Sequence, residues 1–310
     1  MKSFGICTLH TKAEELSYEQ QTIYLEAQKK YDKVILINPR LVNYLFLRAR
    51  PKPVILYKGK NIATLDTLMI RSAQKSEAAV AILARALKSC GCSLIDPTGR
   101  YTVGKSSKLL TTLNRFERGV GTSSYMSFTR TGATSLLKKL NEKGQMPLLT
   151  KPIDGRKGYG VEVIQNLEAG LDCVSRYFGT ANYKPYPFYF QDYIHFKHEY
   201  RVMVINGEAI GIVEKVKLAD KITANAAQGA EFIKADAPEI IKAVLQHVSN
   251  EGILGVDVAL DQNNNIHIIE TNRAPQWQTF EKVTGINVAE IIVAHTLKGP
   301  VKRKKIFGSR

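Results

Sequence analysis

The chain has 310 residues, of which 44% are hydrophobic, and its formal net charge at pH 7 is +16. This composition is typical of a globular protein large enough for two or three subdomains. No apolar run approaches the ~20 residues of a membrane-spanning helix, and residues 1–10 lack the apolar segment of a secretory signal, so we expect a cytoplasmic protein that does not enter a membrane.

The charge is distributed unevenly along the chain. Residues 1–150 carry a net charge of +14, residues 151–297 carry −4, and residues 298–310 carry +6. A basic first half and a basic end would attract an anionic partner, either a nucleic acid or an acidic peptide. A solvated basic surface explains the same pattern, so charge alone does not choose between these interpretations.

The first hundred residues alternate between strand-like and helix-like segments. Lys33–Asn38, Pro53–Tyr57 and Asp66–Arg71 are short β-rich runs. Ser76–Cys90 has apolar residues at helical spacing, and Gly91 is placed as a helix stop. This alternation predicts an α/β layer with a small parallel sheet.

Residues Gly99–Ser106 match the phosphate-binding pattern G-x-x-x-x-G-K-[ST]. A phosphate-binding loop of this kind follows a strand directly, but here Asp96-Pro97-Thr98 intervenes, and the bulky Tyr101 and Val103 occupy the loop. We therefore treat a P-loop centred on Lys105 as an alternative and not as the main prediction.

A second glycine-rich loop lies in the middle of the chain. Phe116–Thr131 is rich in Gly, Ser and Thr and predicts a connection between subdomains, and Thr134–Lys143 predicts a short basic helix. The strand Met146–Pro152 then leads into the loop Asp154–Gly160, and a further strand follows it. Three glycines in this loop allow backbone N–H groups to face phosphate oxygens, although a plain glycine-rich hairpin has the same pattern.

The next segments predict a helix, an aromatic strand and a hairpin. Leu167–Phe178 is the helix, and Phe188–Ile194 is an aromatic strand that would line either an adenine pocket or a core. Tyr200–Lys217 is a hairpin that turns at Asn206-Gly207, a strong turn signal. Its strands can place Glu199, Arg201 and Lys215 on the wall of a cleft.

The segment Gly252–Asn272 predicts a second hairpin with converging oxygen ligands. Two β-rich runs flank a turn at residues 262–265, and strand alternation puts Glu270 and Asn272 on one face. Together with Asp257 they form the kind of oxygen set that Mg²⁺ binds when phosphates and water complete its shell. The alternative is that these residues are the polar face of a half-exposed hairpin.

The order of these parts resembles the ATP-grasp superfamily, and within it the RimK-like glutamate and amino-acid (carboxylate-amine) ligases, over nearly the whole chain. The resemblance rests on six short motifs. They are Leu149-Thr150-Lys151-Pro152 with the glycine loop, Gln191-Asp192-Tyr193-Ile194, Glu199-Tyr200-Arg201, Asn225, Gly255-Val256-Asp257 and Glu270-Thr271-Asn272-Arg273-Ala274-Pro275.

The resemblance implies an α/β (α+β) ATP-grasp fold of three subdomains. An N-terminal α/β pre-ATP-grasp domain would cover residues 1–105, a central lid 106–195, and a C-terminal ATP-grasp subdomain with the metal site 196–297. Residues 298–310 would form a basic tail. ATP would lie between the lid and the C-terminal subdomain.

The resemblance also implies roles for single residues at the nucleotide. Lys151, Gly158 and Asn225 would lie at the phosphates, and either Lys105 or Lys108 would add an upstream contact. The adenine hinge and the ribose contact would come from Asp192, Tyr193 and Glu199.

At the metal and the reacting carboxylate, the implied residues come from the two hairpins. Asp257, Glu270 and Asn272 would hold Mg²⁺ or Mn²⁺. Arg201 would face the carboxyl group that is activated, and with Asn272 it forms the implied catalytic pair. Thr223 and Gln276 depart from the family pattern near the substrate, so the resemblance does not specify glutamate.

The implied activity is that of an ATP-dependent, ADP-forming carbon–nitrogen ligase. A carboxylate would be phosphorylated to an acyl phosphate, and an amine would then displace phosphate. The expected partners are an amino acid and an acceptor, which is a peptide, a protein or a small-molecule carboxylate. An acidic acceptor would suit the basic first half of the chain. The sequence also allows a homo-oligomer. Two alternatives remain, a P-loop hydrolase or kinase and a nucleic-acid-binding protein, although the chain lacks a recognised nucleic-acid-binding motif.

Overall fold

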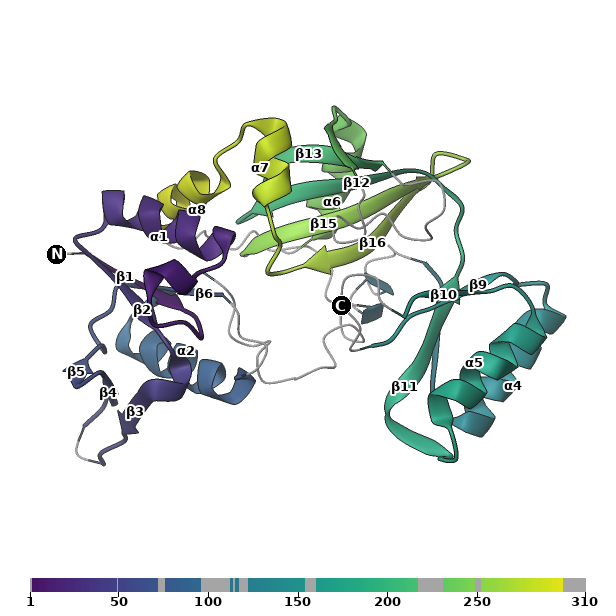
Figure 1. Cartoon of the computed structure of the whole chain (residues 1–310), viewed down its shortest axis with the longest axis horizontal. Coiled ribbons are helices and arrows are strands. Elements are labelled where there is room, and N and C mark those ends of the chain that lie inside the picture. Colours follow the sequence, from purple (N-terminus) through teal and green to yellow (C-terminus); the bar gives the residue numbers. More distant parts are fainter. Residues whose placement is uncertain are drawn as a thin grey trace, which may run out of the picture.

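The computed structural model describes residues 2–48, 50–71, 76–95, 112–113, 115–116, 122–153, 160–216, 231–248 and 252–297. Within them the chain forms a mixed α/β fold built on an N-terminal sheet, a lid sheet and a five-stranded C-terminal sheet, with one further small sheet. The lid sheet and the N-terminal sheet lie at opposite ends of the molecule (Figure 1). None of the helices in the described residues has the length and apolar character needed to cross a bilayer.

The N-terminal sheet is parallel and has the strand order β2-β1-β6-β7. Its strands are β1 (Ser3–Cys7), β2 (Lys33–Ile37), β6 (Thr67–Ile70) and β7 (Ser93–Leu94). Strand alternation sends Phe4 and Ile6 to one face and Cys7 to the other. The first face packs against α1 (Tyr18–Lys30) and the second against α2 (Glu77–Cys90).

The ends of these two helices follow from their sequences. Ser17 accepts a hydrogen bond from the backbone N–H of Gln20, whose side chain accepts one from the N–H of Ser17, a reciprocal cap that starts α1. The predicted stop at Gly91 is confirmed, because this residue ends α2 with φ of 103°, in the left-handed region. Two single 3-10 turns, η1 (Ala13–Glu15) and η2 (Pro39–Leu41), lie in the connections.

The prediction that Pro53–Tyr57 belongs to the parallel sheet was wrong. The strand exists as β4 (Val54–Tyr57), but it pairs antiparallel with β3 (Val42–Leu45) and with β5 (Lys60–Asn61) in the small separate sheet. A parallel pair needs a crossover of a dozen residues or more. The connection from β3 to β4 is shorter than this, so the two strands fold back on each other.

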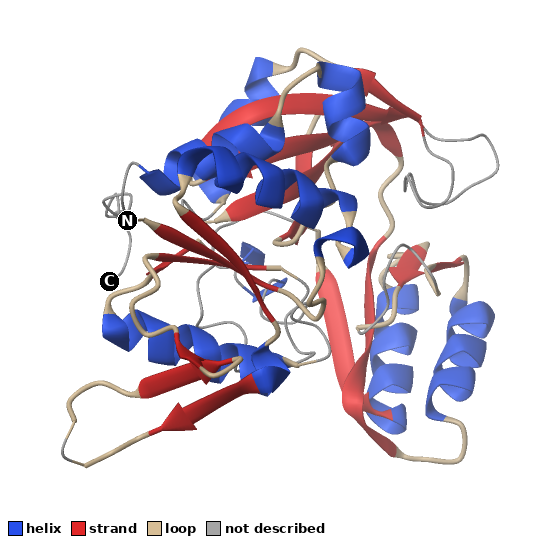
Figure 2. Cartoon of the chain, turned by 60° about the vertical axis from the view of Figure 1, so that its left-hand side comes forward, coloured by secondary structure: helices blue, strands red, loops and turns tan. Residues whose placement is uncertain are grey.

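The lid sheet has the order β10-β9-β11-β8, and α4 and α5 lie side by side on it (Figures 1 and 2). Its elements are β8 (Ser124–Thr129), α4 (Arg130–Glu142), β9 (Leu148–Thr150), β10 (Glu162–Ile164), α5 (Leu167–Phe178) and β11 (Tyr183–Asp192). The predicted strand–loop–strand unit is confirmed by the antiparallel pairing of β9 with β10. Phe188 and Phe190 are buried in the lid core, so these aromatic residues do not line an adenine pocket.

Part of the predicted connection Phe116–Thr131 is a strand. Residues 124–129 pair with β11 as the edge strand β8. The ring of Tyr125 stacks on Phe190 at a centroid distance of 5.6 Å. Aromatic and β-branched residues fit a half-buried strand, and here this preference outweighs the turn signal of the neighbouring Ser and Thr residues.

The C-terminal sheet is antiparallel and has the order β14-β13-β12-β15-β16. Its strands are β12 (Phe196–Ile205), β13 (Glu208–Val216), β14 (Glu231–Lys234), β15 (Ile253–Asp261) and β16 (Ile266–Asn272). The helices that follow or connect them are α6 (Pro238–His247), α7 (Gln278–Thr284) and α8 (Val288–Leu297). Both predicted hairpins are confirmed, and the turn at Asn206-Gly207 has positive φ at both residues, 48° and 84°.

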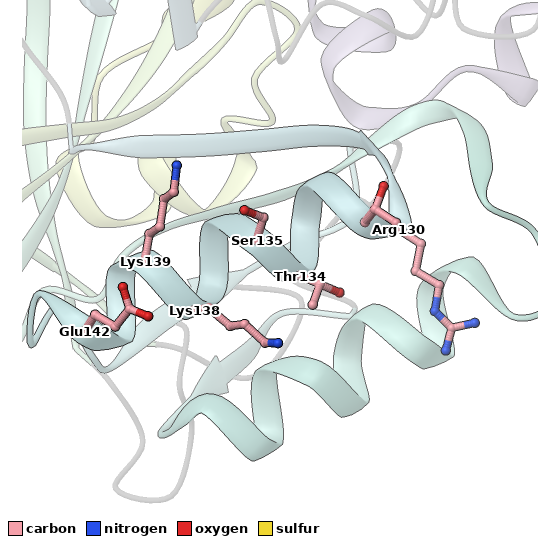
Figure 3. Close-up of a pocket in the computed structure, with 7 residues that line it drawn as sticks. Arg130, Thr134, Ser135, Lys138, Lys139 and Glu142 are labelled. Atoms are coloured by element: carbon pink, nitrogen blue, oxygen red, sulfur yellow. The ribbon is translucent and has the colours of Figure 1, made fainter.

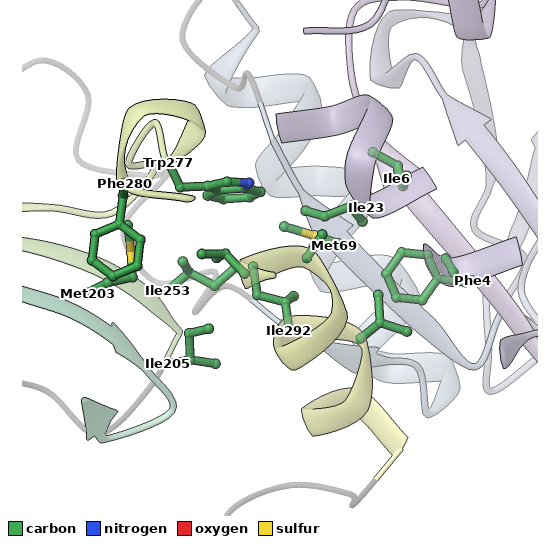
Figure 4. Packing of buried hydrophobic residues seen from close by; sticks show 14 of the residues in the cluster. Phe4, Ile6, Ile23, Met69, Met203, Ile205, Ile253, Trp277, Phe280 and Ile292 are labelled. Carbon is green, nitrogen blue, oxygen red and sulfur yellow. The ribbon is translucent and has the colours of Figure 1, made fainter. Parts of the chain in front are cut away.

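One hydrophobic core joins the N-terminal unit to the C-terminal sheet (Figure 4). Met203 and Ile205 of β12 meet Trp277 and Phe280 on one side, and α8 brings Ile292 against the first strands. Two hydrogen bonds of 2.7 Å reinforce the contact, one from Tyr18 to Glu281 and one between the hydroxyls of Tyr31 and Thr296. The two units are therefore parts of one packed body.

We expect Ile292→Ala to destabilise the N-terminal unit and the C-terminal sheet together, because Ile292 is fully buried in their common core. The free energy of unfolding should fall by about 2–5 kcal/mol. The single tryptophan, Trp277, lies in this core, so its fluorescence in a urea titration reports the loss. Leu137→Ala, in the lid core, is the matched control and should leave the Trp277 midpoint close to that of the wild type. Separate transitions for the two units in Ile292→Ala would contradict a shared core.

Candidate active site

Four charged side chains gather on one face of the C-terminal sheet. β12 supplies Glu199 and Arg201, β13 supplies Lys215, and β15 supplies Asp257. Arg201 and Asp257 are direct cross-strand partners. Since alternate residues of a strand share a face, this is also the face on which Met203 enters the shared core. The cluster thus continues the apolar core toward the lid end of the sheet.

The four side chains form one network, which we call the charged cluster. Arg201 donates from Nε and Nη2 to the two carboxylate oxygens of Asp257, each at 2.8 Å. The Nζ of Lys215 lies 2.5 Å from Glu199 Oε1 and 3.0 Å from Asp257 Oδ1. The Lys215 and Asp257 side chains are only 1% and 6% exposed, so solvent hardly screens these contacts.

Lys215 is shared by two carboxylates whose pKa values move in opposite directions. Burial alone raises the pKa of Asp257, but the charges and hydrogen bonds of Arg201 and Lys215 outweigh it and lower the pKa to about 2. Burial raises the pKa of Glu199, the charge of Asp257 adds to this, and Lys215 opposes it. Asp257 is therefore firmly ionised, whereas Glu199 is the carboxyl group in this network that protonates more readily.

The neighbouring strand β16 adds two oxygen-bearing side chains on the same face. Glu270 is the cross-strand partner of Asp257, and Asn272 is the partner of Gly255, with a break in regular register after Asp257. Carboxylate and amide oxygens suit Mg²⁺. Within the described ranges no three His, Cys, Asp or Glu side chains can hold a metal ion by themselves, so water and substrate phosphates would have to supply the other ligands.

The lid contributes cations opposite β16. Lys151 lies with its Nζ 5.5 Å from the centre of the Tyr189 ring. Burial and the charge of Arg115 lower its pKa to about 8, while Glu270 acts in the opposite direction. Arg115 itself donates from Nη1 to the backbone oxygen of Ile269 and from Nη2 to Thr112. No sequence motif pointed to Arg115, whose position depends on the packing of the lid against β16.

The other predicted residues are placed apart or lie outside the described residues. Asp192 and Tyr193 lie where the lid joins the C-terminal sheet; Asp192 accepts a 3.0 Å hydrogen bond from Tyr125, and the Tyr193 ring meets His195 edge-on at 4.8 Å. The structure thus pairs Arg201 with Asp257 directly and joins Glu199 to Asp257 through Lys215. Glu270 lies opposite Asp257, and Asn272 lies opposite Gly255 on the next strand. The residues outside the described ranges are Lys105, Lys108, Gly158 and Asn225.

A shallow pocket on α4 is a weaker candidate. Its lining includes Arg130, Thr134, Lys138 and Lys139, and Figure 3 shows these side chains spread along the helix without converging on one point. The Arg130 guanidinium donates to the carbonyl of Gly179 and to Ser175, so it fastens α4 to the end of α5. The charged cluster, in which opposite charges converge under burial, remains the candidate site.

The chain is similar to known proteins over most of its length. The family profile described as "RimK-like ATP-grasp domain" matches residues 108–296. A probable alpha-L-glutamate ligase of Syntrophotalea carbinolica is 22% identical over 297 residues, covering 93% of this chain and 95% of that protein. The glutamate–LysW ligase ArgX of Sulfolobus acidocaldarius is 26% identical over 214 residues, covering 66% of this chain and 75% of that one.

Solved structures share the fold. The ATP-grasp ligase PsnB complexed with a minimal precursor has a TM-score of 0.71 at 12% identity, covering 96% of this chain and 98% of that one. The same ligase with precursor, Mg and ADP has a TM-score of 0.66 at 12% identity, covering 96% and 97%. The predicted ATP-grasp fold is thereby confirmed.

We expect Lys215→Met to destabilise the protein by about 3–5 kcal/mol at pH 7, because it removes the cation between two buried carboxylates. The pKa of Glu199, already raised, should rise further. A carboxyl group with a raised folded-state pKa costs stability above its unfolded-state pKa, and this cost disappears as the group is protonated. The stability difference between variant and wild type should therefore shrink as the pH falls from 7 toward 4.

Urea titrations at several pH values measure this difference. Lys234→Met, at an exposed position of β14, is the matched control and should change stability little at any pH. A loss in Lys215→Met that is equally small, or that does not depend on pH, would show that the shared lysine does not hold the two carboxylates together.

Proposed function

Because the chain belongs to the RimK-like ATP-grasp family and is an ATP-dependent carboxylate-amine ligase, we propose that it joins an amino acid to a peptide or protein, releasing ADP and phosphate. The observation that carries the proposal is the charged cluster with Glu270 beside it and the lid cations opposite. Phosphoryl transfer to a carboxylate depends mainly on charge neutralisation and alignment. Buried cations held by fixed carboxylates meet that need without reorganising during the reaction.

The oxygen set on β15 and β16 fits a divalent cation. Asp257, Glu270 and Asn272 would hold Mg²⁺, and Mn²⁺ accepts the same kind of ligands. The fit rests on the cross-strand pairing of Asp257 with Glu270. Carboxylates directly opposite each other repel, and for Asp257 the charges of Arg201 and Lys215 already offset part of this repulsion. A bound metal ion would offset the charge of the nucleotide phosphates.

The protein's own cations would bind and orient the substrates. A guanidinium has five N–H donors, so the two that Arg201 uses for Asp257 leave donors for the oxygens of an acyl phosphate. Its orientation is fixed by the two 2.8 Å bonds. Lys151, from the lid, would contact the phosphates. Glu199 would contact the ribose through its other carboxylate oxygen, because Oε1 accepts a hydrogen bond from Lys215.

The substrate class is supported by the relatives. They include proteins named as probable alpha-L-glutamate ligases, a ligase named for glutamate and LysW, and the ligase PsnB complexed with precursor peptide PsnA2. The net charge of +14 over residues 1–150 favours an acidic acceptor. Family membership accounts for ATP use without the P-loop alternative, whose residues lie outside the described ranges.

The direct test is Glu270→Gln. Glu270 is exposed, so the variant should fold like the wild type, yet ADP release and ligated product should fall by at least about 100-fold because a metal ligand is lost. Turnover is followed as ADP release with mixtures of amino acids and acidic peptides, and mass spectrometry identifies the joined product. Glu239→Gln on the exposed surface of α6 is the matched control. Wild-type ADP release by Glu270→Gln would remove the proposed metal site.

A second prediction concerns the pH dependence of ATP binding. With a pKa of about 8, Lys151 changes from mostly charged at pH 7 to mostly neutral at pH 9, and bound phosphate favours the charged form. ATP affinity should fall by about tenfold over this range, and binding at pH 9 should take up a proton. Calorimetric titrations in two buffers of different ionisation enthalpy measure the uptake. Lys151→Arg, which stays charged, should abolish the pH dependence; an unchanged profile would assign it to another group.

A further inference from the structure

A second set of polar side chains lies at the carboxyl edge of the N-terminal sheet. Thr8 directly follows β1, and Arg71 directly follows β6; the backbone N–H of Arg71 donates to the Cys7 carbonyl at 3.0 Å. In the order β2-β1-β6-β7 the chain passes from β1 to β2 on one side and later to β6 on the other. The edge between β1 and β6 is thus a topological switch point, where open α/β sheets bind their ligands.

The loop that follows β16 lies against this edge. Arg71 donates from Nη2 to the carbonyl of Pro275 at 3.0 Å, and its guanidinium lies 4.8 Å from the centre of the Trp277 ring. Pro275 packs so closely on Gly255 that a Cβ added there would come within 2.8 Å of the proline ring. Gly255 precedes Asp257 by two residues, roughly 7 Å along β15. The loop therefore connects the sheet edge to the charged cluster.

Two buried donors on this loop have no acceptor in the part of the chain that the structure describes. Within the described residues, Nη1 of Arg273 and Nε1 of Trp277 are buried without a hydrogen-bond partner. Trp277 is completely buried, and Figure 4 shows its nitrogen end turned toward Met69 and the N-terminal strands. Buried donors are nearly always paired, and leaving them unpaired is unfavourable. Two such donors on one short loop, beside a switch point, are groups to which a bound anion would supply the missing acceptors.

We propose that this junction binds the free carboxylate of the amino-acid substrate, with Arg273 and Trp277 as donors and Arg71 as the positioning residue that holds the indole ring. This inference rests on the proposed function. In the joining reaction, an amino acid that contributes its amine retains a carboxylate that is not activated. Holding that carboxylate at the sheet edge, away from Asp257 and Glu270, keeps it from the phosphoryl group. A guanidinium matches a carboxylate through two parallel N–H bonds.

The carboxylate assignment has a specificity consequence. A site whose buried donors require an acceptor with negative charge rejects a neutral analogue strongly, because the donors then lose their charged partner. An amino acid should therefore bind much more tightly than its own α-amide. The charged cluster and the lid cations already provide for phosphate, so the junction is left for the second anionic group of the reaction.

The first experiment measures binding without turnover. Each of the twenty standard amino acids is added singly to the full-length protein, and the shift in Tm is recorded. The amino acid that gives the largest shift, and its α-amide, are then titrated calorimetrically. We expect the acid to bind at least about tenfold more tightly than the amide. The proposal fails if none of the twenty amino acids raises Tm, or if the acid and its amide bind with equal affinity. If the two bind equally and inorganic phosphate displaces both, the junction holds phosphate and not a carboxylate.

Two variants remove one donor each. Trp277→Phe keeps an aromatic ring under Arg71 but loses the N–H, and Arg273→Met keeps a long chain without donors. Because the Arg273 donor is unpaired within the described residues, the Tm of Arg273→Met without ligand should be close to that of the wild type. Trp277→Phe also removes volume from the core, so its Tm without ligand should be lower, and affinities are compared at a temperature where all variants are folded. Affinity for the amino acid should fall about tenfold in each variant, and the preference for acid over amide should decrease.

Tyr44→Phe is the matched control, since the Tyr44 hydroxyl is another buried donor without a partner in the described residues but lies in β3, in the small separate sheet. It should bind the amino acid like the wild type. Wild-type affinity in both Trp277→Phe and Arg273→Met overturns the inference even when ADP release proves the ligase activity. Donor-dependent binding of an amino acid that is never ligated would instead refute the proposed function and leave the site in place.

Discussion

The bidentate pair between Arg201 and Asp257 is the interaction on which the rest of the site depends. It joins two neighbouring strands across a direct register pair and fixes both side chains on the charged face of the sheet. A buried ion pair of this kind adds little net stability, because desolvation of both groups opposes the attraction, but removal of one partner leaves a costly buried charge. The register of β12 and β15 is therefore tied to the position of the candidate metal ligand.

The sharing of Lys215 extends this constraint to a second carboxylate. One cation serves Glu199 and Asp257. With Arg201, which has the larger effect, it keeps Asp257 ionised in a place where burial alone would favour protonation. The carboxylate charge is thus available before any ligand arrives. Such preorganisation is the property that electrostatic catalysis requires, since the protein dipoles and charges need not rearrange as charge develops.

The sequence predicted those features that depend on local pattern. Alternation was sufficient to place Glu270 and Asn272 on one face, and Asn206-Gly207 was sufficient to locate a turn, because both signals act within a few residues. The strand β1 escaped prediction because it is only five residues long and contains Gly5. The helix α1 escaped because it buries Glu19 and Gln20 beside only two apolar residues, so its hydrophobic period is weak.

Other features depend on long-range register, which no local pattern contains. That Lys215 contacts both carboxylates follows from the pairing of three strands, and that Arg115 reaches the Ile269 carbonyl follows from the packing of the lid. The edge strand β8 was mistaken for a connection because its Ser and Thr residues imitate a turn, whereas its pairing with β11 is a tertiary contact.

The position of α8 affects how the chain can fold during synthesis. This helix covers the apolar face of the first sheet together with α1, and Tyr31 bonds to Thr296 across 265 residues of sequence. On the ribosome, Phe4 and its neighbours therefore leave the exit tunnel long before the helix that covers them. Contacts so distant along the chain make folding slow and leave apolar surface open to association in the meantime. The nascent N-terminal sheet is accordingly the part of this protein that we expect molecular chaperones to bind.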